Sequence, residues 1–143
     1  WNGKEIEVCV HRKGATRAFG PGSKYVPELY RDVGQPLIIP GSMGTPSYVL
    51  LGTKRAEEEA FASTCHGAGR VMSRHAALKD LKGKDLTEEL EEMGVKVKAR
   101  DKGTLYEEAP DAYKDIDKVV DIVDRAGLSK KVVKLRPLGV IKG

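Results

Sequence analysis

Apolar and polar residues alternate along several short stretches of the chain, which is the pattern of strands that bury one face. The first such stretch covers residues 4–11, where Ile6, Val8 and Val10 are separated by polar neighbours. Short apolar runs bounded by proline, glycine or alternating charges predict further strands at residues 36–40, 48–52, 95–98 and 132–136. The chain is therefore expected to contain strands from near its start to near its end.

Helical spacing appears in three stretches between these strands. Residues 70–79 contain no helix breaker and favour a helix. Asp85 followed by Glu88 resembles a capping box and predicts a helix up to residue 93, and the apolar spacing of residues 116–123 predicts another. Because helices and strands do not alternate in a regular series, the sequence predicts one α+β domain of packed layers.

Length and charge narrow the classes of protein that fit. The chain has 143 residues, and 40% of them are hydrophobic, enough for a core. Its 25 basic and 21 acidic residues are interspersed, so the net charge of +4 favours an acidic partner only weakly. Abundant charge with 6% aromatic residues also fits a heat-stable protein.

The sequence shows no long apolar span, no secretory signal and only two cysteines, which predicts a cytoplasmic protein without a disulfide framework. Because the chain opens at Trp1 instead of a methionine, we expect it to be a piece of something longer.

The strongest candidate for chemistry is the stretch of residues 63–74. His66 follows Cys65 and precedes a glycine-rich turn, so it is expected near a helix N-terminus, where free N–H groups and the helix dipole favour a phosphate. Arg70 and Arg74 are four residues apart and would grip a second phosphate from one helix face. A hydrogen-bonded loop histidine and solvated arginines would explain the same residues. Their coincidence within one short stretch favours phosphoryl chemistry on an anionic substrate.

Two other phosphate chemistries fit the sequence less well. Cys65 as the nucleophile of a thiol phosphatase is disfavoured, because the four residues between it and Arg70 are too few for the required phosphate loop. The loop of residues 41–47 carries the hydroxyls of Ser42, Thr45 and Ser47, which suit phosphate or ribose oxygens. It lacks the Gly-Lys-Ser/Thr of a P-loop, so a P-loop kinase is disfavoured as well.

Four separated motifs resemble the RtcB-type RNA-splicing ligases. They are His11 to Ala18, Pro40 to Thr45, Cys65 to Arg70, and Glu108 to Asp115, in the order that the family shows. The resemblance runs from about residue 8 to the end of the chain, and the abundance of glutamate and lysine suggests a heat-adapted archaeal member. It implies that residues 1–143 are the C-terminal catalytic portion of the larger ligase fold, without the N-terminal metal-binding portion.

The resemblance also implies a reaction. In that family a histidine attacks GTP with manganese bound, and the guanylated histidine passes GMP to an RNA 3′-phosphate. A 5′-hydroxyl then displaces GMP and seals the strand, which joins 3′-phosphate or 2′,3′-cyclic phosphate ends to 5′-hydroxyl ends in tRNA splicing and RNA repair. The implied partners are tRNA halves, the absent N-terminal portion, which would hold most of the manganese, and an archease-type activator. The chain alone is expected to be inactive.

The resemblance assigns roles to individual residues. His66 resembles the guanylated nucleophile, Cys65 becomes a bystander, and no residue of this chain is assigned to a metal. The residues expected at the guanylate are Ser42, Ser47, His66, Gly67, Ala68, Gly69, Tyr113 and Lys142. Those expected at RNA phosphates are Arg12, Lys13, Arg17, Arg70 and Arg74. The alternative is a non-catalytic RNA- or nucleotide-binding domain that keeps the pocket.

Overall fold

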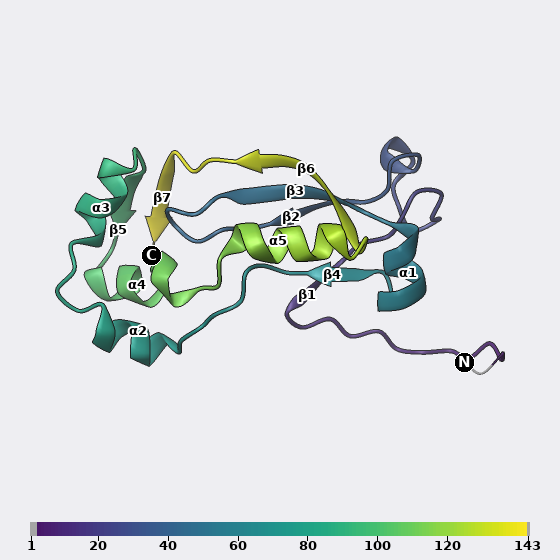
Figure 1. The fold of residues 1–143 in the computed structure, drawn as a ribbon, viewed down its shortest axis with the longest axis horizontal. Helices are drawn as coiled ribbons and strands as arrows, with labels where there is room; N and C mark the ends of the chain where they lie inside the picture. Colours follow the sequence, from purple (N-terminus) through teal and green to yellow (C-terminus); the bar gives the residue numbers. More distant parts are fainter. Residues whose placement is uncertain (1–2, 143) are drawn as a thin grey trace.

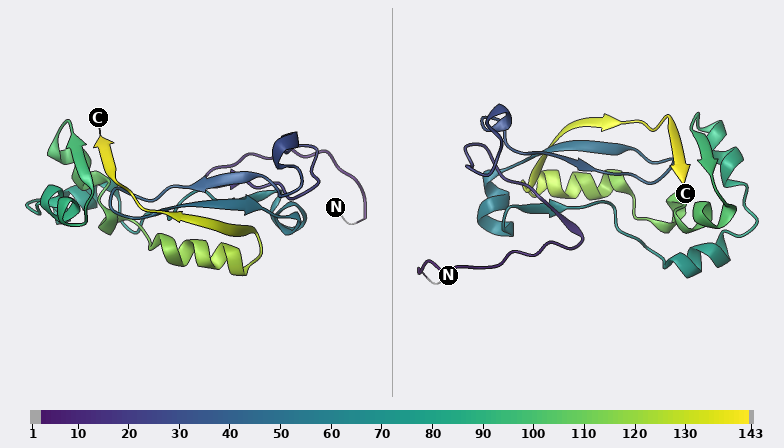
Figure 2. Two further views of the ribbon diagram at one scale, coloured as in Figure 1. Left: turned by 90° about the horizontal axis from the view of Figure 1, so that it is seen from above. Right: turned by 180° about the vertical axis from the view of Figure 1, so that it is seen from behind.

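Three antiparallel strands and one long helix form one half of the molecule (Figure 1). In the computed structural model, which describes residues 3–142, β3 (Ser47–Gly52) lies between β2 (Pro36–Ile39) and β6 (Ser129–Leu135). Helix α5 (Ile116–Arg125) covers one face of this sheet, as the left view of Figure 2 shows. The core between them contains Leu37, Ile39, Tyr48, Leu50, Ile116 and Val120. The strands predicted at residues 36–40 and 48–52 and the helix predicted at 116–123 are confirmed.

The other half packs three short helices around a second core. They are α2 (Arg74–Asp80), α3 (Leu86–Glu92) and α4 (Lys102–Glu107). Beside them β5 (Lys96–Ala99) pairs in parallel with β7 (Gly139–Lys142), the last strand of the chain. The shared core contains Met43, Ala77, Leu81, Leu86, Leu90, Val95 and Leu105. The side chain of Asp85 accepts a hydrogen bond from the Glu88 amide, so the predicted cap of α3 is confirmed.

Several further short elements were not predicted from the sequence, and most of them lie in the half that contains the sheet (Figure 1). Strand β1 (Ala15–Arg17) pairs with β4 (Ser63–Cys65), and α1 (Lys54–Ala60) begins at the capping residue Thr53. The 3-10 turns η1 (Glu28–Tyr30) and η2 (Pro110–Ala112) complete the series. Strands of three residues are too short to show alternation, and seven-residue α1 is mostly polar, so neither leaves a clear signal in the sequence. With helices and strands segregated in this way, the fold is α+β.

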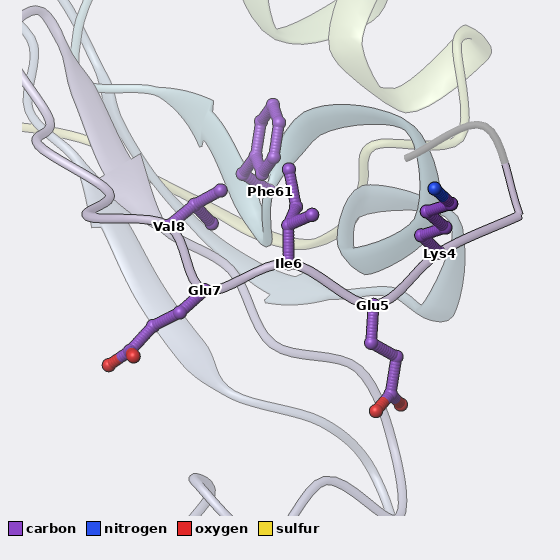
Figure 3. A pocket seen from close by; sticks show the side chains of 6 residues that line it. All are labelled: Lys4, Glu5, Ile6, Glu7, Val8 and Phe61. Atoms are coloured by element: carbon purple, nitrogen blue, oxygen red, sulfur yellow. The ribbon is translucent and has the colours of Figure 1, made fainter.

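Residues 4–11 do not form the predicted strand. Figure 3 shows this segment extended, with Ile6 and Val8 on the side of Phe61 and with Glu5 and Glu7 on the opposite side. The alternation is thus real, but among residues 3–142 no strand lies beside the segment to complete a ladder. A strand needs a partner for its backbone hydrogen bonds, which an alternating sequence cannot supply by itself.

The helix predicted from residue 70 begins later, at Arg74. The hydroxyl of Ser73 accepts a hydrogen bond from the amide of Ala76 and caps the helix there. Arg70 instead pairs its backbone with Tyr113 in an isolated β-bridge. The absence of breakers therefore allowed a helix from residue 70, whereas the serine cap and this bridge set its start. None of the helices within residues 3–142 has the length and apolar character needed to cross a membrane.

A buried pair of hydroxyls joins β4 to β6, and it gives a test of the fold. Thr64 and Ser129 are both buried, and their oxygens lie 3.0 Å apart. Thr64→Val keeps the shape but leaves the Ser129 hydroxyl unpaired, so the free energy of unfolding in urea should fall by about 1–3 kcal/mol. Adding Ser129→Ala should recover part of this loss, because the unpaired group is then gone. Equal losses in the single and double variants would contradict the pairing.

Candidate functional site

A cavity of about 450 Å³ lies where the two halves meet. Its volume falls in the usual range of small-molecule sites, about 300–1,000 Å³. Five segments far apart in the sequence converge on it: Gly14 before β1, the loop after β2, the loop after β4, the stretch after α4, and β7. The lining residues that carry polar or small groups include Ser42, Thr45, His66, Gly67, Ala68, Gly69, Glu108, Tyr113 and Lys142. Seven of the eight residues expected at the guanylate therefore line one cavity.

A larger hollow, of about 620 Å³, lies between residues 4–8 and Phe61 (Figure 3). Its lining consists of the apolar side chains of Ile6, Val8 and Phe61 with Lys4 and two glutamates. No imidazole, hydroxyl or glycine-rich backbone faces it. We therefore place the candidate site in the smaller cavity, where groups suited to phosphate chemistry converge.

The loop between β2 and β3 is held in place by its own hydroxyls. The amide of Gly41 donates to Ser47 Oγ at 3.0 Å, and the amide of Ser42 donates to Thr45 Oγ1 at 2.7 Å. Position 41 tolerates only glycine, because a Cβ there would lie 2.1 Å from the carbonyl oxygen of Pro46. Ser47 is thus the one expected guanylate residue outside the cavity lining, and it supports the loop that presents Ser42.

His66 lies in an exposed loop that directly follows β4. Its amide donates to the Gly14 carbonyl at 3.4 Å, which ties the loop to the end of the basic turn. Because α2 begins only at Arg74, the expected position at a helix N-terminus is wrong, and the helix dipole cannot serve a phosphate at His66. Free backbone N–H groups lie beside His66 instead. Within residues 3–142, nothing accepts a hydrogen bond from the amides of Gly67, Ala68 or Gly69. Such a run of free N–H groups suits an anion.

Cys65 has surroundings that suppress its reactivity. Its side chain packs against the core between the sheet and α5. Burial raises the pKa of the thiol above its ordinary value, and a hydrogen bond with Thr64 offsets this only in part. The thiolate is the nucleophilic form, so a raised pKa disfavours catalysis by Cys65.

Arg70 and Arg74 converge on Glu108 and do not project from one helix face. Arg70 donates to Tyr113 Oη at 2.9 Å and to the Glu107 carbonyl at 2.6 Å, and its guanidinium lies 4.7 Å from the centre of the Tyr113 ring. The Glu108 carboxylate accepts from Arg74 at 3.2 Å and lies 3.7 Å from Arg70. The reason is the late helix start, which leaves Arg70 in the bridge to Tyr113 and only Arg74 on α2.

Glu108 is the carboxylate around which the cations beside the cavity gather. Burial works to raise its pKa, but hydrogen bonds from Tyr113 and Arg74 and the charges of Lys142 and Arg74 outweigh it, so the pKa lies below its ordinary value. Burial and then the short hydrogen bond to Glu108 raise the pKa of Tyr113, which keeps this phenol protonated. Glu108 belongs to one of the four motifs, but its charge partners Arg74 and Lys142 are distant in the chain, so the sequence shows no role for it.

Two residues of the basic segment, Arg12 and Arg17, lie apart from this cavity. Arg12 donates to Ser63 Oγ at 2.8 Å and to the Phe61 carbonyl at 2.9 Å, so its guanidinium is engaged in holding β4. Arg17 lies 5.7 Å from the Phe19 ring centre, and both arginines line a separate shallow hollow. Lys13 is exposed beside Gly14, which does line the cavity. The structure therefore separates the five expected RNA contacts into two groups.

The side chains near the cavity offer few metal ligands. Among residues 3–142, no three His, Cys, Asp or Glu side chains lie close enough together to hold one. The donors beside the cavity do not make a manganese site by themselves, and we assign no step to a metal held by this chain.

Comparison with known proteins gives one consistent result. The family model described as tRNA-splicing ligase RtcB matches residues 2–143. Proteins named tRNA-splicing ligase RtcB from Archaeoglobus fulgidus and Pyrococcus horikoshii are 64% and 56% identical over 142 residues, 99% of this chain. An RNA-splicing ligase RtcB homolog 1 from Entamoeba histolytica is 49% identical over the same length. The chain spans only 30%, 16% and 27% of these three relatives.

The lowered pKa of Glu108 predicts a specific pH dependence. A carboxyl group whose pKa is lower in the folded state stabilises the fold above its ordinary pKa of about 4.5, and this stabilisation is lost as pH falls through the folded-state pKa. In Glu108→Gln the acid-induced fall in the free energy of unfolding should therefore be smaller. Urea titrations from pH 7 to acid pH test this, with Glu107→Gln as the neighbouring control. Identical pH dependence in Glu108→Gln and the unsubstituted protein would contradict the assignment.

Proposed function

Residues 2–143 belong to the tRNA-splicing ligase RtcB family, and from that premise we propose that this chain is the C-terminal catalytic portion of a GTP- and manganese-dependent RNA ligase. The observation that carries the proposal is the convergence of His66, Ser42, Tyr113 and Lys142 on one cavity. These residues come from four separate parts of the chain, so a common purpose explains their meeting better than local packing does.

The cavity has suitable partners for each part of a guanine nucleotide. The free amides of residues 67–69 provide donors for phosphate oxygens, and Ser42 provides a hydroxyl beside them. Tyr113 offers an aromatic face, and Lys142 offers a cation that can donate to the guanine carbonyl. Lys142 is held within β7, whose pairing with β5 keeps it at the cavity.

His66 is proposed to act as the nucleophile. A neutral imidazole nitrogen attacks the α-phosphorus of GTP and pyrophosphate leaves, which gives a guanylated histidine. The RNA 3′-phosphate then takes GMP from the histidine, and a 5′-hydroxyl displaces GMP to form the phosphodiester. The exposure of His66 supports this role, because both GTP and an RNA end must reach the same nitrogen.

RNA is the proposed partner, with tRNA halves as substrates in a cytoplasmic setting. Arg74 is exposed and ion-pairs with the cavity residue Glu108, and exposed Lys13 precedes the cavity residue Gly14, so both cations are available to RNA phosphates near the cavity. Arg12 and Arg70 are engaged with protein groups and are proposed to position neighbouring residues as well. Manganese and an archease-type activator are proposed to act with the portion of the ligase outside this chain.

A non-catalytic nucleotide-binding domain is the second candidate, favoured by the lack of a three-ligand metal site within residues 3–142. Both candidates can be tested in a chimera, defined as the Archaeoglobus fulgidus relative with its matched region replaced by this chain. Covalent attachment of GMP supports the ligase, whereas GTP binding without attachment supports the second candidate.

Covalent labelling of the chimera tests the nucleophile. With manganese and radiolabelled GTP, His66→Ala should lose essentially all covalent label, because no other side chain at the cavity can replace the imidazole. His75→Ala, on exposed α2 outside the cavity, and Cys65→Ala should keep most of it. Label retained by His66→Ala would place the nucleophile elsewhere.

Nucleotide affinity tests the role of Lys142. Lys142→Met removes a charged donor, which should weaken GTP binding by about 1.5–3 kcal/mol and reduce the preference for guanine over adenine. Isothermal titration of the chimera measures both quantities. Lys98→Met, an exposed lysine of the paired strand β5, is the matched control and should bind GTP normally. Unchanged affinity and base preference in Lys142→Met would rule out the contact.

A further inference from the structure

The sheet of β2, β3 and β6 has one face that nothing in residues 3–142 covers with a helix. Helix α5 packs on the other face, and the right view of Figure 2, taken from behind, shows the three strands in front with α5 beyond them. Neighbouring side chains on a strand point to opposite faces, so the residues between the buried ones belong to the open face. Leu37 and Ile39 are buried under α5, which places Ile38 on the open face.

The centre of the open face is apolar on all three strands, with the polar residues Ser47 and Lys130 toward its ends. Ile38 pairs with Val49, and Val49 pairs with Val133, which makes one continuous row. Leu51 and Leu135 extend the same face on either side of the row. Ile38 is 63% exposed and Val133 is 43% exposed. An antiparallel sheet that faces water normally carries polar side chains on that face, so this sequence is suited to burial.

The lengths of the relatives indicate what covers this face. The 142 matched residues are 30% of the Archaeoglobus fulgidus protein, so more than two thirds of that chain lies outside the match. We propose that the open face of the β2, β3 and β6 sheet is an interface within the complete ligase, covered by an apolar layer from the portion outside residues 1–143. This inference rests on the proposed function, because it takes the chain to be part of the longer ligase.

The extended segment of residues 5–10 supports the same occupant. It alternates like a strand, and among the described residues none hydrogen bonds to it. Ile6, Val8 and Phe61 are exposed together on one side of it (Figure 3). An extended backbone with free donors and acceptors and an apolar side is ready to add to a sheet of another segment. The open sheet face and the segment of residues 5–10 are thus two apolar surfaces that further chain of the longer ligase would cover.

Cysteine labelling of the chimera tests the interface. Ile38→Cys and Val133→Cys are each made, together with Ile122→Cys on α5, which is 66% exposed and serves as the matched control. A water-soluble maleimide is added, and labelling of each peptide is followed by mass spectrometry. Positions 38 and 133 should react at least about ten-fold more slowly than position 122, because reaction requires the interface to open. Equal rates at the three positions would overturn the proposal.

Two further measurements separate the outcomes. Light scattering gives the oligomeric state during labelling, and protection that disappears as a dimer dissociates would mean that a second copy covers the face, which overturns the proposal. Guanylation of His66 is measured in the same variants. Rapid labelling of position 38 in a guanylated chimera refutes the interface alone. Protection without guanylation supports the interface and counts against the ligase function.

Discussion

The parallel pairing of β7 with β5 is the contact on which the geometry of the cavity depends. Its register places Lys142 opposite Ala99, and the amide of Arg100 donates to the Lys142 carbonyl at 3.0 Å. β5 is fixed in turn by the core that Leu90 and Val95 form with the helices of that half. A cation near the end of the chain is thus positioned by apolar packing far from it in sequence, and loss of that packing would empty one side of the cavity.

Glu108 also fixes the arrangement of side chains at the cavity, because three cations lie around it. Arg70, Arg74 and Lys142 would repel one another, and a partly buried carboxylate among them offsets that repulsion. The same carboxylate accepts the hydrogen bond of Tyr113 and so fixes the phenol at the cavity wall. A phosphate that binds Arg74 must compete with Glu108. Binding of an anionic ligand and release of this ion pair are therefore linked.

The two halves have separate cores, and the cavity lies at their junction. This arrangement explains why the site draws on loops from both halves, since each half alone supplies only part of the lining. It also agrees with the open sheet face and with the extended segment of residues 5–10. A chain that spans 30% of a relative is expected to leave apolar surfaces that the remainder completes.

The sequence by itself determined the elements with strong local signals. Proline-bounded apolar runs predicted β2 and β3, Asp85 predicted the start of α3, and the apolar spacing of α5 predicted that helix. It also singled out most of the cavity residues, through motifs whose order and residue types are characteristic. These signals lie within a few residues of one another, so propensity, capping and periodicity suffice to read them.

Only the tertiary structure decided where the helix after His66 begins, which strands find partners, and what the arginines contact. Arg70 is drawn into a bridge with Tyr113 that is 43 residues away in the chain, and within residues 3–142 no strand pairs with the alternating residues 5–10. The central role of Glu108 appears only when Arg74, Tyr113 and Lys142 meet around it. Pairing and charge compensation depend on which distant segments are brought together, and a local pattern of residues does not contain that information.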